Sequence, residues 1–111
     1  MASPAREFDT AGASSAPAGS LGRDEAETLA RTLRAVADPT RLQVLSIISH
    51  SPDGEITVGD LAQHLGLRQP TVSHHLRIMV GDGLLARDQR GRNAWYSIVE
   101  SRRADIADLI R

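Results

Sequence analysis

The chain is most constrained by residues 60–79, DLAQHLGLRQPTVSHHLRIM, where two short helical patterns are joined by a tight turn. Thr57 stands where an N-cap of the first pattern is expected. Gly66 is the left-handed residue that typically ends such a helix, and Pro70 is expected at the first position of the next one. Two short helices connected in this way predict a helix-turn-helix.

The second of these helices carries two adjacent histidines, His74 and His75. Neighbouring helical positions point about 100° apart, so the two imidazoles cannot share a face. His75 falls on the apolar stripe formed by Val72, Leu76 and Met79. We therefore expect His75 to pack against the protein and His74 to face outward. The outward side is also expected to carry Thr71, Ser73 and Arg77.

Two further helices are expected before this motif. Apolar residues recur at helical spacing over about 24–37, and Asp38-Pro39 ends that pattern because a residue before proline avoids helical angles. Thr40 is then expected to cap a second helix, which is rich in buried leucine, isoleucine and valine.

After the helix-turn-helix, two strand-like runs enclose the polar, glycine-containing tip QRGRN and predict a β-hairpin. The pattern ESRRADIADLIR predicts a last helix. The expected order is α-α-α-α-β-β-α, a mainly α chain with a small β-hairpin (α+β). This order predicts a winged helix-turn-helix.

The first 22 residues differ in composition, since 15 of them are Ala, Ser, Gly or Pro. Such a segment buries too little apolar surface to offset its ordering entropy. We expect residues 1–22 to be a disordered tail and residues 23–111 to form one DNA-binding and dimerisation domain. No apolar run approaches membrane-spanning length and no signal-peptide core is present, so a cytoplasmic protein is expected.

Positive charge is concentrated locally in this chain. The net charge is only −1, which indicates no overall basic field. Residues 61–81 nevertheless contain no acidic residue, and residues 68–92 contain five arginines against two aspartates. All 13 basic residues are Arg, whose planar guanidinium can pair in a bidentate manner with guanine or phosphate. A basic helix beside a basic hairpin is suited to reading one DNA groove and gripping the next.

The exposed polar residues supply the contacts that DNA recognition needs. Gln69 can pair with adenine, Thr71 can meet a thymine methyl group, and Arg77 can pair with guanine or phosphate. The arginines on either side of Gly91 suit the narrow minor groove or its phosphates. A solvated polar helix face is the simpler alternative. The predicted DNA-binding residues are Arg68, Gln69, Thr71, Ser73, His74, Arg77, Arg90 and Arg92.

Three stretches together resemble the ArsR/SmtB family of bacterial regulators: AVADPTRLQVLSII (35–48), DLAQHLGLRQPTVSHHLRIM (60–79) and DGLLARDQRGRNAWYSI (82–98). The likeness covers roughly residues 25–100. It implies a homodimer, built from the first and last helices, that binds palindromic operators and usually represses resistance or homeostasis genes. Many members release DNA when a metal binds. The short, cysteine-free chain is most similar to the actinobacterial nickel-responsive branch of the family.

The metal sites familiar from the family are not intact in this sequence. The position of a Cys-Val-Cys-like pair is taken by residues 56–60, which have no thiol, and the chain has no Cys at all. Zinc- and nickel-type members of the family have a metal ligand at the start of the last helix. This chain has Arg102 at that position, and a guanidinium cannot coordinate a metal. Borderline metals such as nickel and zinc accept imidazole and carboxylate ligands. The remaining weak candidates are His50, Asp53 and Glu55, although three such residues in an exposed turn are commonplace.

The sequence therefore predicts a dimeric DNA-binding transcriptional regulator, with no cofactor established and a divalent metal such as nickel or zinc as the candidate effector. The alternative is a winged-helix protein-interaction module, or a co-regulator that needs a partner subunit for effector sensing. A protein-docking helix would more often expose aromatic residues or leucine than an acid-free polar face. An enzyme is the least favoured reading, because no catalytic triad, carboxylate pair or phosphate loop has supporting context.

Overall fold

The computed structural model describes residues 16–110, and the chain divides into two units, residues 1–30 and 31–111. Most of the tail expected over residues 1–22 lies outside the described residues, so its disorder stays a prediction. No helix in the described part is long and apolar enough to cross a membrane.

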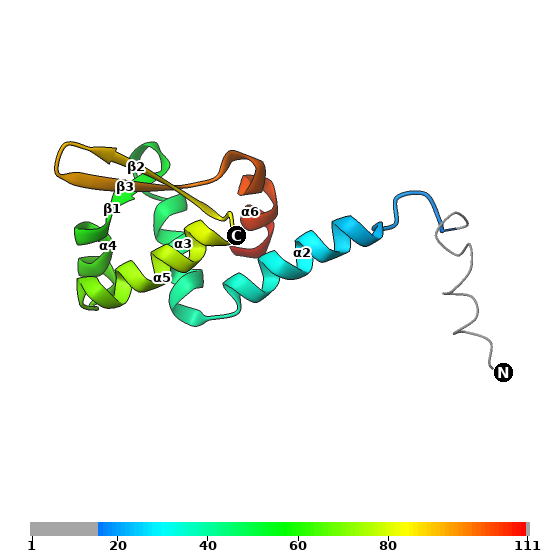
Figure 1. Cartoon of the computed structure of the whole chain (residues 1–111), viewed down its shortest axis with the longest axis horizontal. Coiled ribbons are helices and arrows are strands. Elements are labelled where there is room, and N and C mark those ends of the chain that lie inside the picture. The colour runs from blue at the N-terminus through cyan, green and yellow to red at the C-terminus, as the bar shows by residue number, and fades with distance from the viewer. Residues whose placement is uncertain (1–15, 111) are drawn as a thin grey trace. The chain divides into compact units, whose positions relative to one another are not determined.

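The described residues form five α-helices and three strands (Figure 1). The predicted winged helix-turn-helix is confirmed, with one added strand. Two short 3-10 helices, Pro52–Gly54 and Glu100–Arg102, join neighbouring elements. The order is α2 (Arg23–Val36), α3 (Pro39–Ser49), β1 (Glu55–Thr57), α4 (Val58–Leu65), α5 (Gln69–Gly81), β2 (Leu85–Arg90), β3 (Asn93–Ile98) and α6 (Arg103–Ile110).

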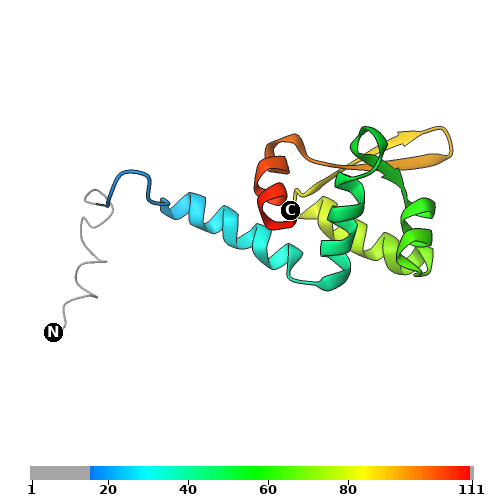
Figure 2. The same cartoon turned by 180° about the vertical axis from the view of Figure 1, so that it is seen from behind.

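The hairpin β2–β3 is widened by β1 into an antiparallel sheet of order β1-β3-β2. Its tip lies at the same end of the second unit as α4, whereas α6 lies at the other end (Figures 1 and 2). In the register, Leu85 is opposite Ile98, Arg87 is opposite Tyr96, and Asp88 is opposite Trp95. Directly opposed residues share a face of a sheet. Arg87 therefore lies on the face of the buried Tyr96, and Asp88 lies on the other face with Trp95.

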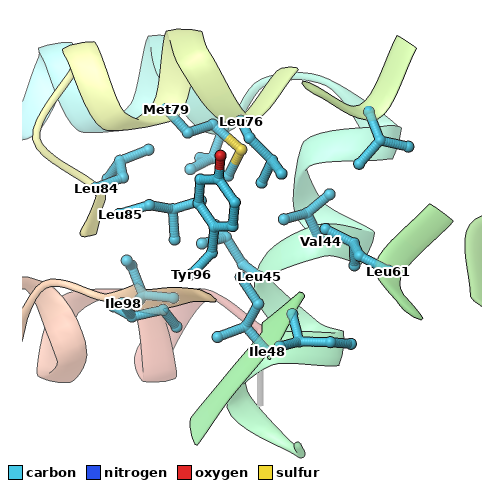
Figure 3. Packing of buried hydrophobic residues seen from close by; sticks show 14 of the residues in the cluster. Val44, Leu45, Ile48, Leu61, Leu76, Met79, Leu84, Leu85, Tyr96 and Ile98 are labelled. Carbon is cyan, nitrogen blue, oxygen red and sulfur yellow. The ribbon is translucent and has the colours of Figure 1, made fainter. Parts of the chain in front are cut away.

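The core joins the helix-turn-helix to this sheet (Figure 3). The ring of Tyr96 on β3 lies among buried aliphatic side chains, and its hydroxyl end points toward the helix that carries Leu76 and Met79 (Figure 3). Truncating a fully buried Leu or Met to Ala costs about 2–5 kcal/mol of unfolding free energy. The orientation of α5 is thus set by packing. The side chains with no exposed surface are those of Val44, Leu45, Ile48, Leu61, Val72, Leu76, Met79 and Leu84.

The helix boundaries confirm two of the expected signals and correct two others. Thr57 Oγ1 accepts from the Asp60 amide at 3.3 Å, and Gly66 ends α4 with a left-handed φ of 68°. The cap of α3 is Asp38 rather than Thr40: its Oδ2 accepts from the Arg41 amide at 3.0 Å. Asp38 is extended because it precedes a proline, which is the conformation an N-cap needs. Pro70 is the second residue of α5 rather than the first.

Candidate nucleic-acid interface

Helix α5 presents the polar face that the sequence predicted, next to the turn that ends α4. Val72, Leu76 and Met79 are buried on its inner side. Its first turn contains no acidic residue, and none follows before its end at Gly81. Ser73 is half-buried. The predicted contact residues around this helix that are exposed are Arg68, Gln69, Thr71, His74 and Arg77.

The two histidines separate as predicted. His74 is exposed, whereas His75 is half-buried, and their rings are 6.2 Å apart between centroids with 61° between their planes. Arg41 Nε donates to His75 Nδ1 at 3.2 Å, and Arg41 Nη1 donates to the carbonyl of Ala35 at 3.4 Å. Because Nδ1 accepts this bond, the ring proton of neutral His75 resides on Nε2. Sequence reasoning missed the role of Arg41, which joins α3 to α5.

On the β2–β3 hairpin, which is the wing of this fold, Arg90 forms ion pairs with two other residues of the same chain. Its Nη1 and Nη2 donate to the Glu55 carboxylate at 2.6 and 2.9 Å, and its Nε donates to Asp88 at 2.8 Å. The guanidinium also lies over the Trp95 ring, 5.4 Å from its centroid. Arg92, at the tip, is exposed and makes no ion pair among residues 16–110. Of the two predicted wing contacts, only Arg92 presents an uncompensated charge.

The Glu55–Arg90 pair has a defined pH dependence. The hydrogen bonds from Arg90 lower the pKa of Glu55 below its ordinary value. A carboxyl group with a lowered pKa in the folded state stabilises that state above its unfolded-state pKa, and this contribution disappears as the pH falls through the folded-state pKa. The pair therefore anchors the wing at neutral pH and is lost only in acid. Since Arg90 is about half exposed, solvent screens the pair and its contribution is small.

The opposite face of the wing holds an arginine that sequence reasoning missed. Arg87 on β2 faces the side of the sheet that Tyr96 occupies, because the two residues are paired in the register. It lines a hollow together with Ser73 and Arg77 of α5. The alternation of β2 could have indicated this face, but only once the register with β3 was known.

The weak metal candidates do not assemble into a site. His50 Nδ1 lies 2.8 Å from the carbonyl oxygen of Ser46, and the carboxylate of Glu55 is taken up by Arg90. Within residues 16–110, no three His, Asp or Glu side chains are arranged so that they could hold a metal ion. The predicted set of His50, Asp53 and Glu55 is therefore not a ligand set in this structure, because two of its members are turned toward other partners.

Comparison with known proteins identifies the family. The model of "Bacterial regulatory protein, arsR family" matches residues 38–87, which span α3 to the first residues of β2. The HTH-type transcriptional regulator NmtR of Mycobacterium tuberculosis is 36% identical over 92 residues, covering 83% of this chain and 74% of its own. This chain belongs to the ArsR family. A probable mercury resistance operon repressor of Streptomyces lividans is also similar, at 40% identity over 103 residues (88% of this chain, 80% of the relative).

Solved structures agree with this ArsR-family assignment. HlyU from Vibrio cholerae superposes with a TM-score of 0.72 at 28% identity, covering 79% of this chain and 94% of that one. The homodimeric winged helix-turn-helix DNA-binding domain of a possible ArsR-family regulator from Mycobacterium bovis gives 0.64 at 28% identity, covering 85% and 83%. The protein is thus an ArsR-type DNA-binding transcriptional regulator, and the relatives named here are transcriptional regulators rather than enzymes.

Proposed function

We propose that two copies of this chain bind one palindromic operator, each placing α5 in the major groove and its wing against the flanking backbone. The observation that carries this proposal is the outward face of α5, which is exposed, polar and free of acidic residues. A helix of this kind attracts the phosphates electrostatically and offers donors to base edges. The homodimeric state of the M. bovis domain supports the twofold arrangement.

The residues near the start of α5 are proposed to read bases. Gln69 pairs with adenine, Thr71 contacts a thymine methyl group, and His74 donates to a base edge or phosphate. We assign Arg68, the N-cap residue of α5, to a contact with the phosphate backbone. On the wing we assign the phosphate or minor-groove contact to Arg92, because Arg90 is already paired with Glu55 and Asp88.

Repression is the favoured direction of regulation, since the S. lividans relative is described as a probable operon repressor. A repressor of this kind blocks the promoter by occupying an operator, and we propose that the protein does so in the cytoplasm. The alternative of a protein-docking module is less well supported: in the described structure, the outward face of α5 exposes neither an aromatic residue nor a leucine.

The proposal is tested by selecting sites for the purified full chain from a random-sequence duplex pool. We expect the enriched sequences to contain two inverted half-sites whose centres are about one helical turn apart, roughly 10 base pairs. The variant His74→Ala, carried through the same selection, should lose preference within each half-site but keep the spacing. A pool that shows no enriched sequence after repeated rounds would contradict sequence-specific binding.

A further inference from the structure

The β2–β3 hairpin and α5 line an open hollow of about 310 Å³. Its lining residues are Ser73, Arg77, Val80, Arg87 and Tyr96. Ser73, Arg77 and Val80 follow one another at i, i+4 and i+7, so they form one edge of α5. Arg87 and Tyr96 face this edge from the sheet, because they are opposed in the β2–β3 register. The hollow therefore belongs to the join between the two elements proposed to meet DNA.

The polar groups that line the hollow can all donate hydrogen bonds, and none of the lining residues is acidic. The Arg77 side chain makes no ion pair or hydrogen bond within residues 16–110, and the Arg87 side chain only donates to Gln89 Oε1 at 2.6 Å. Two guanidinium groups lining one hollow without a carboxylate repel each other. A bound anion would relieve that repulsion.

Tyr96 adds a hydroxyl donor to the hollow. Its residue surface is only 9% exposed, and its hydroxyl end points toward α5 (Figure 3). No hydrogen bond joins this hydroxyl to another described residue, and no buried side-chain oxygen or nitrogen within residues 16–110 lacks a partner. The hydroxyl therefore keeps some accessible surface and is free to donate. Because Tyr96 lines the hollow, its hydroxyl can donate to a ligand oxygen bound there.

We propose that this hollow binds one phosphate group, held by Arg77 and Arg87 with the hydroxyls of Ser73 and Tyr96. In the DNA complex that group is a backbone phosphodiester lying between the recognition helix and the wing; this source rests on the proposed function. Guanidinium forks pair well with tetrahedral phosphate oxygens, and hydroxyls add the remaining donors. A hollow of about 280 Å³ elsewhere has the opposite character, being lined by Asp53, Glu55, Asp60, His64 and Trp95 among others.

Two variants and one control separate the phosphate site from general charge effects. Arg87→Gln removes a guanidinium from the hollow, and Tyr96→Phe removes only a hydroxyl while keeping the ring that packs in the core. Arg103→Gln is the matched control, since it removes the same charge from an exposed arginine that pairs with Glu100. Arg103 is the first residue of α6, which lies at the other end of the second unit from the hairpin tip (Figure 1). The thermal melts of all variants show whether each one folds.

The first probe is inorganic phosphate, titrated into the free protein at constant ionic strength set with chloride. The side-chain Nε–H signals of Arg77 and Arg87 should shift in a saturable manner. Arg87→Gln and Tyr96→Phe should each weaken phosphate binding by about tenfold, as expected for a lost hydrogen bond to a charged group, and Arg103→Gln should not. Shifts that do not saturate, or that Arg87→Gln leaves unchanged, would overturn the phosphate site.

The second probe is a short random-sequence duplex, which tests whether DNA is the source of the phosphate. Arg87→Gln should flatten the slope of log Kd against log salt by about one unit, while Arg103→Gln leaves it unchanged. If phosphate binds but this slope is the same as in the wild type, the DNA assignment is wrong. If the wild type binds no DNA, the proposed function fails, and the phosphate titration still decides whether the hollow is an anion site.

Discussion

At the scale of single residues, the adjacent histidines of α5 differ in their surroundings. His75 accepts a hydrogen bond from Arg41 on α3, whereas His74 is exposed beside the other candidate base contacts. Helix geometry, together with the apolar stripe of α5, predicted which histidine faces inward. It could not predict the partner, because Arg41 lies 34 residues earlier and only tertiary packing brings the two side chains together.

Replacing His74 with Ala should weaken specific DNA binding by about 1–3 kcal/mol without changing stability, as expected for a base-edge contact on an exposed helix face. His75→Ala should instead lower the melting temperature, because it removes the acceptor of Arg41 Nε and leaves space next to the core. Parallel thermal melts and anisotropy titrations measure both effects. If both substitutions changed only stability, the assignment of the two faces would be wrong.

At the scale of elements, the wing has two faces with different chemistry. One face carries the network of Arg90, Glu55 and Asp88 over Trp95, and the other carries Arg87 toward α5. The hairpin itself was predictable from its two strand-like runs and its Gly91 turn. The strand β1 was not, since three residues show no periodicity and exist as a strand only because they pair with β3. The ion pair to Glu55, 35 residues from Arg90, depends on that pairing.

The two arginines of the wing tip should therefore differ in their effect on DNA binding. Arg92→Ala should flatten the salt dependence of binding by about one unit of slope, because it removes one phosphate contact. Arg90→Ala should leave the slope close to that of the wild type, since its charge is already compensated by two carboxylates. Titrations of a random-sequence duplex at several salt concentrations make the comparison. Equal flattening by both substitutions would show that Arg90 leaves Glu55 when DNA binds.

At the scale of the whole molecule, apolar side chains that the single chain leaves uncovered point to a second copy. Leu33 on α2 is 43% exposed and Leu109 on α6 is 45% exposed. We expect a twofold dimer at micromolar concentration, with its two recognition helices about 34 Å apart. Light scattering should give twice the 12.0 kDa mass of the chain, and Leu109→Glu should shift the protein toward monomer. A wild-type protein that is monomeric under these conditions would contradict the twofold operator.

Within residues 16–110, His50, Asp53 and Glu55 do not form a group that could hold a metal ion. We predict that added nickel or zinc changes DNA affinity by less than tenfold, a coupling of under about 1.4 kcal/mol. Coupling is reciprocal, so calorimetric titration of each metal into the free and the DNA-bound protein measures it from both sides. A submicromolar site whose occupancy abolishes DNA binding would contradict this prediction and identify a dedicated metal sensor.

The central claim, that the polar face of α5 reads a palindromic operator, is tested most directly by one comparison of affinities. Fluorescence anisotropy would be measured at physiological salt on the best palindrome from the random pool and on a shuffled duplex of the same composition. The structure predicts one dimer per duplex and binding at least about a thousandfold tighter to the palindrome. Equal affinity for the two duplexes would contradict sequence-specific reading by α5 and leave only electrostatic attraction.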